Sequence, residues 1–228
     1  MMSARNSLAV ILVTLLLLSG GAAMHGIIPS QQLTQQANKE FEKDSPALDF
    51  RDGDLIFQSS KSGQSLAVQL ATRSKWSHMG MLFRVEGQWM VYEAVGPVKY
   101  TPLKAWIAHG DGHHYVVKRL VNADEVLDEE TLSDLRNAAE AFDGLPYDFY
   151  FGWDDDRIYC SELAWKAYKS ATGLKIGELA TIGDMDLSHP AVQEKLKERY
   201  GDAIPMKEQV ITPGDVFNSP LLVTVMVE

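Results

Sequence analysis

The chain has 228 residues, of which 46% are hydrophobic, and its 21 basic and 31 acidic side chains give a formal net charge of −10 at pH 7. A surface with this excess of acid repels nucleic acid and anionic lipid, and no run of basic residues offsets it, so we expect neither as a partner. The length is sufficient for one domain with a substantial core.

The first 23 residues follow the order of a secretory signal peptide. Arg5 is the only charged side chain before an almost wholly apolar run at residues 8–18, and small residues occupy 19–23. Because the run is shorter than the ~20 residues of a spanning helix, we expect cleavage after Ala23 and a periplasmic or secreted protein without stable membrane anchoring. An uncleaved N-terminal anchor is the alternative. After cleavage a single domain would span residues 24–228, with 20 basic against 31 acidic side chains and a net charge of −11.

Strand patterns dominate the first part of this domain. In order, the residues predict a polar lead-in at 29–43, a strand at 54–57, a helix at 63–71 and two β-type runs at 78–85 and 89–95. Runs rich in Val, Phe, Tyr and Trp on either side of a glycine-bearing turn, here Glu86-Gly87-Gln88, predict a β-hairpin.

Helical patterns dominate the rest. The residues predict helical turns at 102–109, a strand at 115–121, a helix at 127–142, an aromatic loop at 145–159, a helix from Cys160 to about Gly173, a helix at 191–200, a turn at 212–215 that enters extended structure, and a closing strand at 221–227. Apolar residues at helical spacing, ended by glycine and proline, support these helices. The fold class is therefore α+β, with strands concentrated before the Cys160 helix.

The hairpin allows its register to be worked out. If Val85 pairs with Gln88 across a two-residue turn, opposed residue numbers sum to 173, and Glu93 faces Gly80. Side chains alternate along a strand, so His78 and Glu93 become diagonal neighbours on one face, about 7–8 Å apart between backbones. A register summing to 171 would place them directly opposite. A carboxylate there can orient the imidazole and stabilise its charged form, whereas a purely structural histidine is the alternative.

Cys160 is the only cysteine of the chain, and it stands where an amphipathic pattern begins. It therefore has no partner for a disulfide within the chain. At a helix N-terminus, unpaired N–H groups and the macrodipole favour an anion, which lowers the pKa of a thiol and supplies thiolate near neutral pH. The position indicates a nucleophile if a histidine can reach it, and a small buried apolar residue is the alternative.

Five short blocks occur in one order along the chain: DGDLIF at 52–57, WSHMG at 76–80, YEA at 92–94, PYD at 146–148 and YCSE at 159–162. Together they resemble the permuted branch of the NlpC-type papain-like cysteine hydrolases, the YiiX/YebB-like proteins, over about residues 51–173. The resemblance implies a circularly permuted papain-like fold, in which an antiparallel sheet packs against helices and the histidine strand precedes the cysteine helix.

The resemblance also implies acyl transfer. Cys160 would be the nucleophile, His78 the general base and then the acid, and Glu93 the third, orienting residue. The backbone N–H of Cys160 would donate to the developing oxyanion, and Tyr147 or Tyr159 could add a phenolic donor. The alternative role of both tyrosines is packing.

Two other classes of function stay open. His109, Asp111, His113 and His114 lie within six residues and could bind zinc, which would make the chain a metallohydrolase or a zinc-binding module. Their spacing matches none of the strong zinc signatures, so a polar turn before the next strand is favoured. A papain-like fold retained for binding without turnover is the other alternative. Trp76 is expected to form a pocket wall.

The expected substrate contains an amide or peptide-like acyl bond. Export makes cell-wall peptide a candidate, although no separate wall-binding domain is visible, and lipid acyl groups, which permuted relatives also handle, are a second candidate. The acidic surface favours a substrate with a free amine. We expect no metal and no cofactor.

Overall fold

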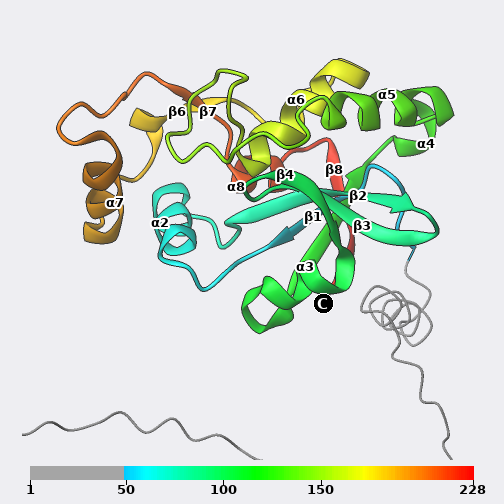
Figure 1. The fold of residues 1–228 in the computed structure, drawn as a ribbon, viewed down its shortest axis with the longest axis horizontal. Helices are drawn as coiled ribbons and strands as arrows, with labels where there is room; N and C mark the ends of the chain where they lie inside the picture. The colour runs from blue at the N-terminus through cyan, green and yellow to red at the C-terminus, as the bar shows by residue number, and fades with distance from the viewer. Residues whose placement is uncertain (1–48) are drawn as a thin grey trace, which may run out of the picture.

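The computed structural model describes residues 49–228, so the expected signal peptide, the lead-in at 29–43 and the start of the predicted domain lie outside the described residues. A six-stranded antiparallel sheet lies at the centre (Figure 1), in the order β4-β3-β2-β1-β5-β8. Its strands are β1 (Leu55–Gln58), β2 (His78–Val85), β3 (Gln88–Ala94), β4 (Val98–Pro102), β5 (Tyr115–Leu120) and β8 (Leu222–Val227).

Helices cover both faces of this sheet and one of its ends. They are α2 (Gly63–Thr72), α3 (Leu103–His109), α4 (Ala123–Val126), α5 (Glu129–Glu140), α6 (Cys160–Thr172), α7 (Pro190–Tyr200) and α8 (Pro213–Phe217). Helices α5 and α6 lie over one face and α3 over the other, while α2 and α7 lie together at one end of the molecule. Two short strands, β6 (Ala180–Thr181) and β7 (Gln209–Val210), form a separate ladder. Within the described range, no helix is both long enough and apolar enough to span a membrane.

The α+β prediction, with an antiparallel sheet against helices, is confirmed. The prediction of a turn entering extended structure at 212–215 is wrong, because these residues begin helix α8. Thr212 Oγ1 accepts from the Asp215 backbone N–H at 3.1 Å, and the Asp215 carboxylate accepts from the Thr212 N–H at 3.0 Å. This reciprocal cap, with Pro213 at the first helical position, is a helix-start signal that resembles a turn in sequence.

The hairpin register is the one that the sequence predicts. Val85 lies opposite Gln88, and Met81 lies opposite Tyr92, so opposed numbers sum to 173. The turn residues Glu86 and Gly87 both have positive φ, 50° and 80°, as a two-residue hairpin turn requires. This register sends alternate side chains of β2 to opposite faces of the sheet.

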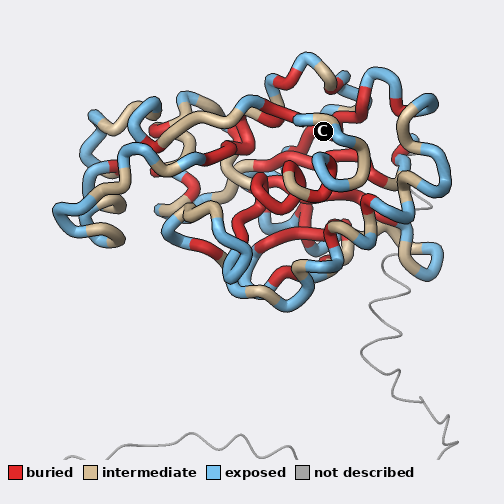
Figure 2. The backbone as a smooth tube through the Cα atoms, turned by 90° about the horizontal axis from the view of Figure 1, so that it is seen from above, coloured by how far each residue is buried: buried red, intermediate tan, exposed pale blue. Residues whose placement is uncertain are grey.

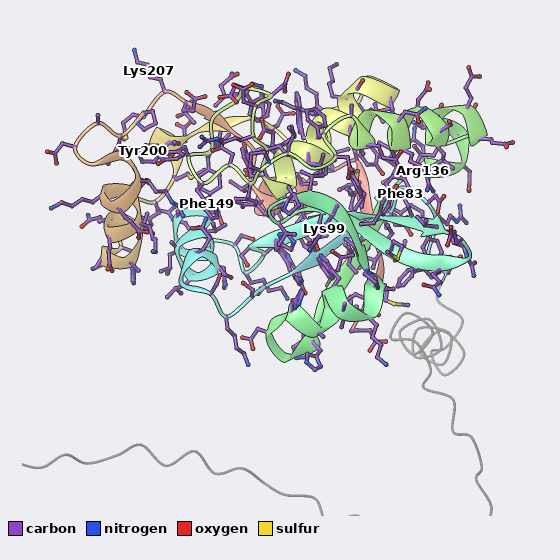
Figure 3. The ribbon with its side chains drawn as sticks, viewed as in Figure 1. Phe83, Lys99, Arg136, Phe149, Tyr200 and Lys207 are labelled. Atoms are coloured by element: carbon purple, nitrogen blue, oxygen red, sulfur yellow. The ribbon has the colours of Figure 1, made fainter. Side chains whose placement is uncertain are left out.

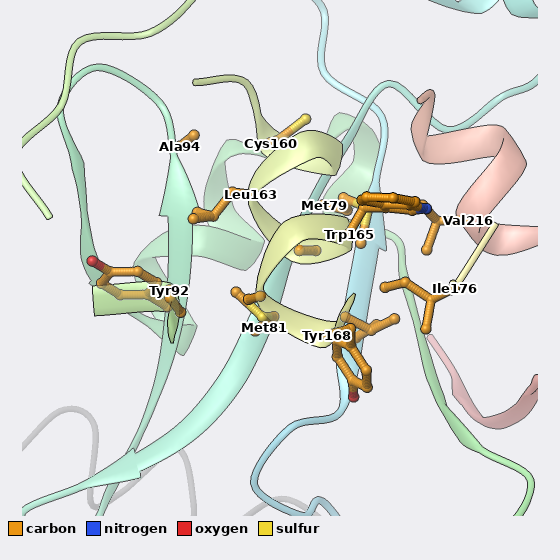
Figure 4. Packing of buried hydrophobic residues seen from close by; sticks show 14 of the residues in the cluster. Met79, Met81, Tyr92, Ala94, Cys160, Leu163, Trp165, Tyr168, Ile176 and Val216 are labelled. Atoms are coloured by element: carbon orange, nitrogen blue, oxygen red, sulfur yellow. The ribbon is translucent and has the colours of Figure 1, made fainter. Parts of the chain in front are cut away.

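The two faces carry separate cores. On one face, Met79 and Met81 of β2 pack beneath α6, which begins at Cys160 (Figure 4). On the other face, Leu82 of β2 and Trp106 of α3 belong to a second buried cluster. The most deeply buried backbone lies in the sheet and in α6, whereas the chain around α7 is more exposed (Figure 2). Burial of one such side chain stabilises the fold by about 1.5–3 kcal/mol. The packed sheet therefore supports the residues at the ends of its strands, among them His78.

Gly80 of β2 provides a test of this packing. It lies opposite Glu93, and a Cβ atom there would stand 2.4 Å from Val91 Cγ1 and 2.9 Å from the Tyr92 carbonyl oxygen. We expect Gly80→Ala to lower the free energy of unfolding by about 1–3 kcal/mol, because backbone must move to admit the methyl group.

Gly63→Ala is the matched control, since a Cβ atom at Gly63 meets no atom within 4 Å. Its free energy of unfolding should stay within about 0.5 kcal/mol of wild type in a urea titration. Equal stability of the two variants would show that the close approach at Gly80 does not exist.

Candidate active site

Cys160 is the first residue of α6 and is 3% exposed. Its sulfur interacts with the His78 ring and with the backbone N–H groups of Met79 and Ser161. Burial raises the pKa of the thiol, but these hydrogen bonds and the charge of His78 outweigh it and hold the pKa below the ordinary value. The sulfur is therefore poised to be a thiolate.

His78 lies between Cys160 and Glu93. Its Nε2 atom is 2.5 Å from Oε2 of Glu93, which leaves Nδ1 for the sulfur of Cys160. Burial by itself lowers the pKa of the imidazole, yet the hydrogen bonds and negative charges of Cys160 and Glu93 raise it to about 10. The structure thus brings the three predicted residues into one hydrogen-bonded chain, although β2, β3 and α6 supply one each.

Glu93 accepts hydrogen bonds from two residues that the sequence analysis did not identify, Trp106 and Thr101. Trp106 Nε1 donates to Oε2 at 2.9 Å, and Thr101 Oγ1 donates to Oε1 at 2.5 Å. Burial raises the pKa of Glu93, but the bond and charge of His78 and these two donors keep it below its ordinary value. The Trp106 ring also stacks on His78, with centroids 5.9 Å apart. Glu93 is 2% exposed, and a buried carboxylate needs hydrogen-bond donors around it. An acid predicted inside a buried strand is therefore the signal that such donors exist nearby.

Tyr147 reaches the site from the aromatic loop. The loop pairs with the residues just before α6 through a bridge between Tyr147 and Ile158, and Asp148 stabilises it by accepting from Tyr150 N–H at 2.8 Å and Gly152 N–H at 2.6 Å. The Tyr147 hydroxyl interacts with the sulfur of Cys160. Burial, followed by the negative charge of Cys160, raises the pKa of Tyr147 well above its usual value, so the phenol keeps its proton as a donor.

Tyr159 and Ser161, on either side of Cys160 in the sequence, both form hydrogen bonds with the backbone of Ile211. The Tyr159 hydroxyl accepts from the Ile211 backbone N–H at 3.1 Å, and the Ser161 hydroxyl donates to the Ile211 carbonyl at 2.8 Å. The ring of Tyr159 packs edge-on against Phe151, with centroids 5.1 Å apart. These contacts give Tyr159 a scaffolding position beside the site.

A mainly apolar pocket opens beside Cys160. It lies between α2, α7 and the segment around Ile211, and Tyr147 and Tyr159 both contribute to its wall. Tyr200, at the end of α7, marks this end of the molecule in Figure 3, whereas Arg136 and Phe83 mark the other end. The expectation that Trp76 forms a pocket wall is wrong, because Trp76 packs in the core with its ring centroid 4.7 Å from that of Phe217.

The four residues considered for zinc do not converge. His109, Asp111, His113 and His114 are all exposed, and Asp111 pairs with Lys61 at 3.1 Å. Across residues 49–228, no group of three or more His, Cys, Asp or Glu side chains is arranged to hold a metal ion.

The hydrogen-bonded chain predicts how Cys160 reacts with alkylating agents. Because its pKa is lowered, Cys160 should react with iodoacetamide at pH 6 faster than an ordinary thiol of pKa ~8.5, and the rate should fall as pH falls through the lowered pKa. His78→Ala removes the bond and charge that lower the pKa, so the alkylation midpoint should move to higher pH. An unchanged pH–rate profile in His78→Ala would show that the two groups do not interact.

Known proteins resemble this chain in sequence and in fold. The model of a family described as permuted papain-like amidase enzyme, YaeF/YiiX, C92 family, matches residues 49–226. The uncharacterized protein YiiX of Escherichia coli (strain K12) is 52% identical over 176 residues, which cover 77% of this chain and 86% of the relative.

The crystal structure of metalloprotein yiiX from Escherichia coli O157:H7 is similar, with a TM-score of 0.75 and 52% identity, over 78% of this chain and 97% of that one. The residues of the site do not fit a metal ion. Nε2 of His78 is bonded to Glu93, so that only Nδ1 of His78 and the sulfur of Cys160 are left as ligands. Family match and relatives lead to one conclusion: this chain belongs to the permuted papain-like amidase family, YaeF/YiiX.

Proposed function

We propose that this chain is a cysteine amidase in which Cys160 is the nucleophile, His78 the general base and acid, and Glu93 the residue that orients His78. The observation that carries the proposal is the continuous chain of contacts from the Cys160 sulfur through the His78 ring to the Glu93 carboxylate. A buried thiolate needs a cation beside it, and a charged imidazole needs an acceptor on its far side; this chain supplies both.

The reaction follows from these positions. The Cys160 thiolate attacks the carbonyl carbon of an amide, and the charged His78 gives its proton to the amide nitrogen, so that the C–N bond breaks and the amine leaves. The acyl group is then held as a thioester on Cys160. Neutral His78 takes a proton from water, the hydroxide attacks the thioester, and the acid leaves while the thiolate and charged imidazole re-form.

Two donors are suited to stabilise the oxyanion. The backbone N–H of Cys160, at the first position of α6, has no acceptor within the helix. The Tyr147 phenol, which interacts with the sulfur and keeps its proton, would be the second donor. Tyr159 is assigned to the scaffold, because its hydroxyl is bonded to Ile211.

The proposed substrate is a peptide or an acylated amine, and the signal-like pattern of residues 1–23 supports a location outside the cytoplasm. Cell-wall peptide fits export, and an acylated small molecule fits the apolar pocket beside Cys160. A papain-like module that binds without turnover remains the competing function, and the following experiments separate the two.

Substitutions in the chain of three residues test the roles. Cys160→Ser should abolish detectable turnover while preserving the fold, because oxygen and sulfur differ little in volume but greatly in nucleophilicity at neutral pH. His78→Ala should lower kcat by about 10²–10⁴-fold, since a general acid–base catalyst contributes that much. Glu93→Gln should lower kcat less, because the imidazole remains present.

The measurement is turnover of a panel of muropeptides and N-acylated amines, with intact mass spectrometry to detect the acyl group on Cys160. Full activity in Cys160→Ser, or the absence of any adduct in wild type, would favour the binding module. Urea titrations of each variant distinguish lost chemistry from lost stability.

Tyr147→Phe tests the oxyanion donor. We expect kcat to fall by about 10²-fold with little change in stability, because the ring remains and only the donor is lost. Tyr150→Phe is the control in the same loop, since Tyr150 is 48% exposed. Tyr159→Phe should instead cost about 1 kcal/mol of stability by leaving the Ile211 N–H without its acceptor. Equal kcat in Tyr147→Phe and wild type would remove Tyr147 from the mechanism.

A further inference from the structure

Glu162 is a buried acid that the proposed mechanism does not use. It follows Cys160 by two residues in α6 and is 0% exposed. Its Oε2 atom accepts from the Tyr159 backbone N–H at 3.3 Å, and its Oε1 atom lies 2.8 Å from Nζ of Lys166, one turn further along the helix. The bond to Tyr159 fixes the residue directly before Cys160, as an acid at the third helical position can do. The buried charge of Glu162 is tolerated because Lys166 lies beside it.

Lys166 attaches α6 to the aromatic loop. Its Nζ atom donates to Oδ1 of Asp155 at 2.7 Å and to the backbone carbonyls of Asp154 at 3.3 Å and Trp153 at 3.5 Å. It also lies over the Trp153 ring, 5.1 Å from the centroid, and that ring packs edge-on against Trp165 of α6, which Figure 4 labels. The side chain of Lys166 is 15% exposed, so water screens these contacts only in part.

Ile158 links these attachments to Tyr147. One attachment lies before Ile158 in the chain, and the other lies directly after it. The Ile158 N–H donates to the carbonyl of Pro146 at 3.2 Å, and the Ile158 carbonyl accepts from the N–H of Asp148 at 3.1 Å. Both partners are neighbours of Tyr147, whose hydroxyl interacts with the sulfur of Cys160. The ion pair on α6 therefore fixes the backbone that directs this phenol to the sulfur.

The attachment depends on the charge of Glu162. Burial raises the pKa of Glu162, the bond and charge of Lys166 and the N–H of Tyr159 oppose the rise, Asp148 adds to it, and the pKa becomes about 7. Asp155 pairs with Lys166 from its other side, and the Tyr159 phenol keeps its proton because burial raises its pKa well above the usual value. A protonated Glu162 no longer forms an ion pair with Lys166 and accepts less strongly from Tyr159.

We propose that Glu162 is a positioning residue: its ionised carboxylate, paired with Lys166, holds the aromatic loop on α6, and uptake of a proton loosens the loop and moves Tyr147 away from the sulfur. The site would then be complete in neutral and alkaline solution and incomplete in acid. The proposal rests on the amidase function, because Tyr147 is assigned there as an oxyanion donor. Glu162→Gln imitates the protonated acid, since it keeps the size of the side chain and an acceptor for Tyr159 but carries no charge.

NMR of a protein labelled with ¹⁵N-tryptophan measures the loop without turnover. The indole N–H signal of Trp153, identified by its loss in Trp153→Phe, should shift with pH and have its midpoint near the pKa of Glu162, about 7. In Glu162→Gln the signal should stay at the position that the wild-type protein shows in acid. Asp156→Asn is the matched control, because Asp156 is an exposed acid of the same loop, and its removal should leave the titration unchanged.

Activity tests whether Glu162 acts through Tyr147. With a substrate from the panel above, kcat should fall as pH falls through about 7, and Glu162→Gln should lower kcat about tenfold in alkali with little change in KM. The double variant should be no slower than Tyr147→Phe alone, because both changes remove the same donor. The pKa of Glu162 in the fold lies above its ordinary value, so its protonation stabilises the folded state as pH falls and does not unfold the protein.

Three results would overturn the proposal: a wild-type Trp153 signal that does not titrate near pH 7, a Glu162→Gln signal that matches the wild-type signal in alkali, or additive losses of kcat in the double variant. Failure of the amidase function has a different signature, namely a Trp153 titration that Glu162→Gln abolishes, with no turnover of any compound in the panel.

Discussion

An ionised carboxylate buried beside an imidazole sets the geometry of this site. Glu93 is 2% exposed, and such a group is tolerated only where donors surround it. His78 is one donor, and Thr101 and Trp106 are the others. Removal of one partner from a buried charge pair costs about 3–5 kcal/mol, so β3, β4 and α3 are held to the histidine strand by the same group that orients the imidazole.

The residues next to the nucleophile also fix the position of the pocket wall. Tyr159 and Ser161, on either side of Cys160, both bond the backbone of Ile211 and thereby fix one wall of the pocket relative to the sulfur. Sheet and helix bring His78 and Cys160 together through the packing of Met79 and Met81 beneath α6. The reactive groups thus inherit their positions from buried, rigid elements, which is what precise chemistry requires.

Local sequence patterns predict much of the arrangement of the site. The two-residue turn pairs Val85 with Gln88, and the period of two along β2 and β3 then places His78 and Glu93 on one face. Thr101 escaped prediction because β4 is short and its partner is set by tertiary pairing, not by its own five residues. Trp106 escaped because only the folded chain brings α3 to Glu93. The pocket escaped for the same reason: α2 and α7 are far apart in sequence and meet only in the folded protein.

The central claim is that Cys160 and His78 form a thiolate–imidazolium pair beside Glu93. Carbon-detected NMR of ring-labelled histidine, followed against pH, reports the charge of His78 directly. Burial lowers the pKa of this ring, but the bonds to Cys160 and Glu93 raise it to about 10, so the ring should stay charged through the neutral range and lose its proton only near that pH. In Cys160→Ala the transition should move to lower pH, because one negative partner is gone. A ring in the wild-type protein that titrates near 6.5, unaffected by Cys160→Ala, would contradict the account.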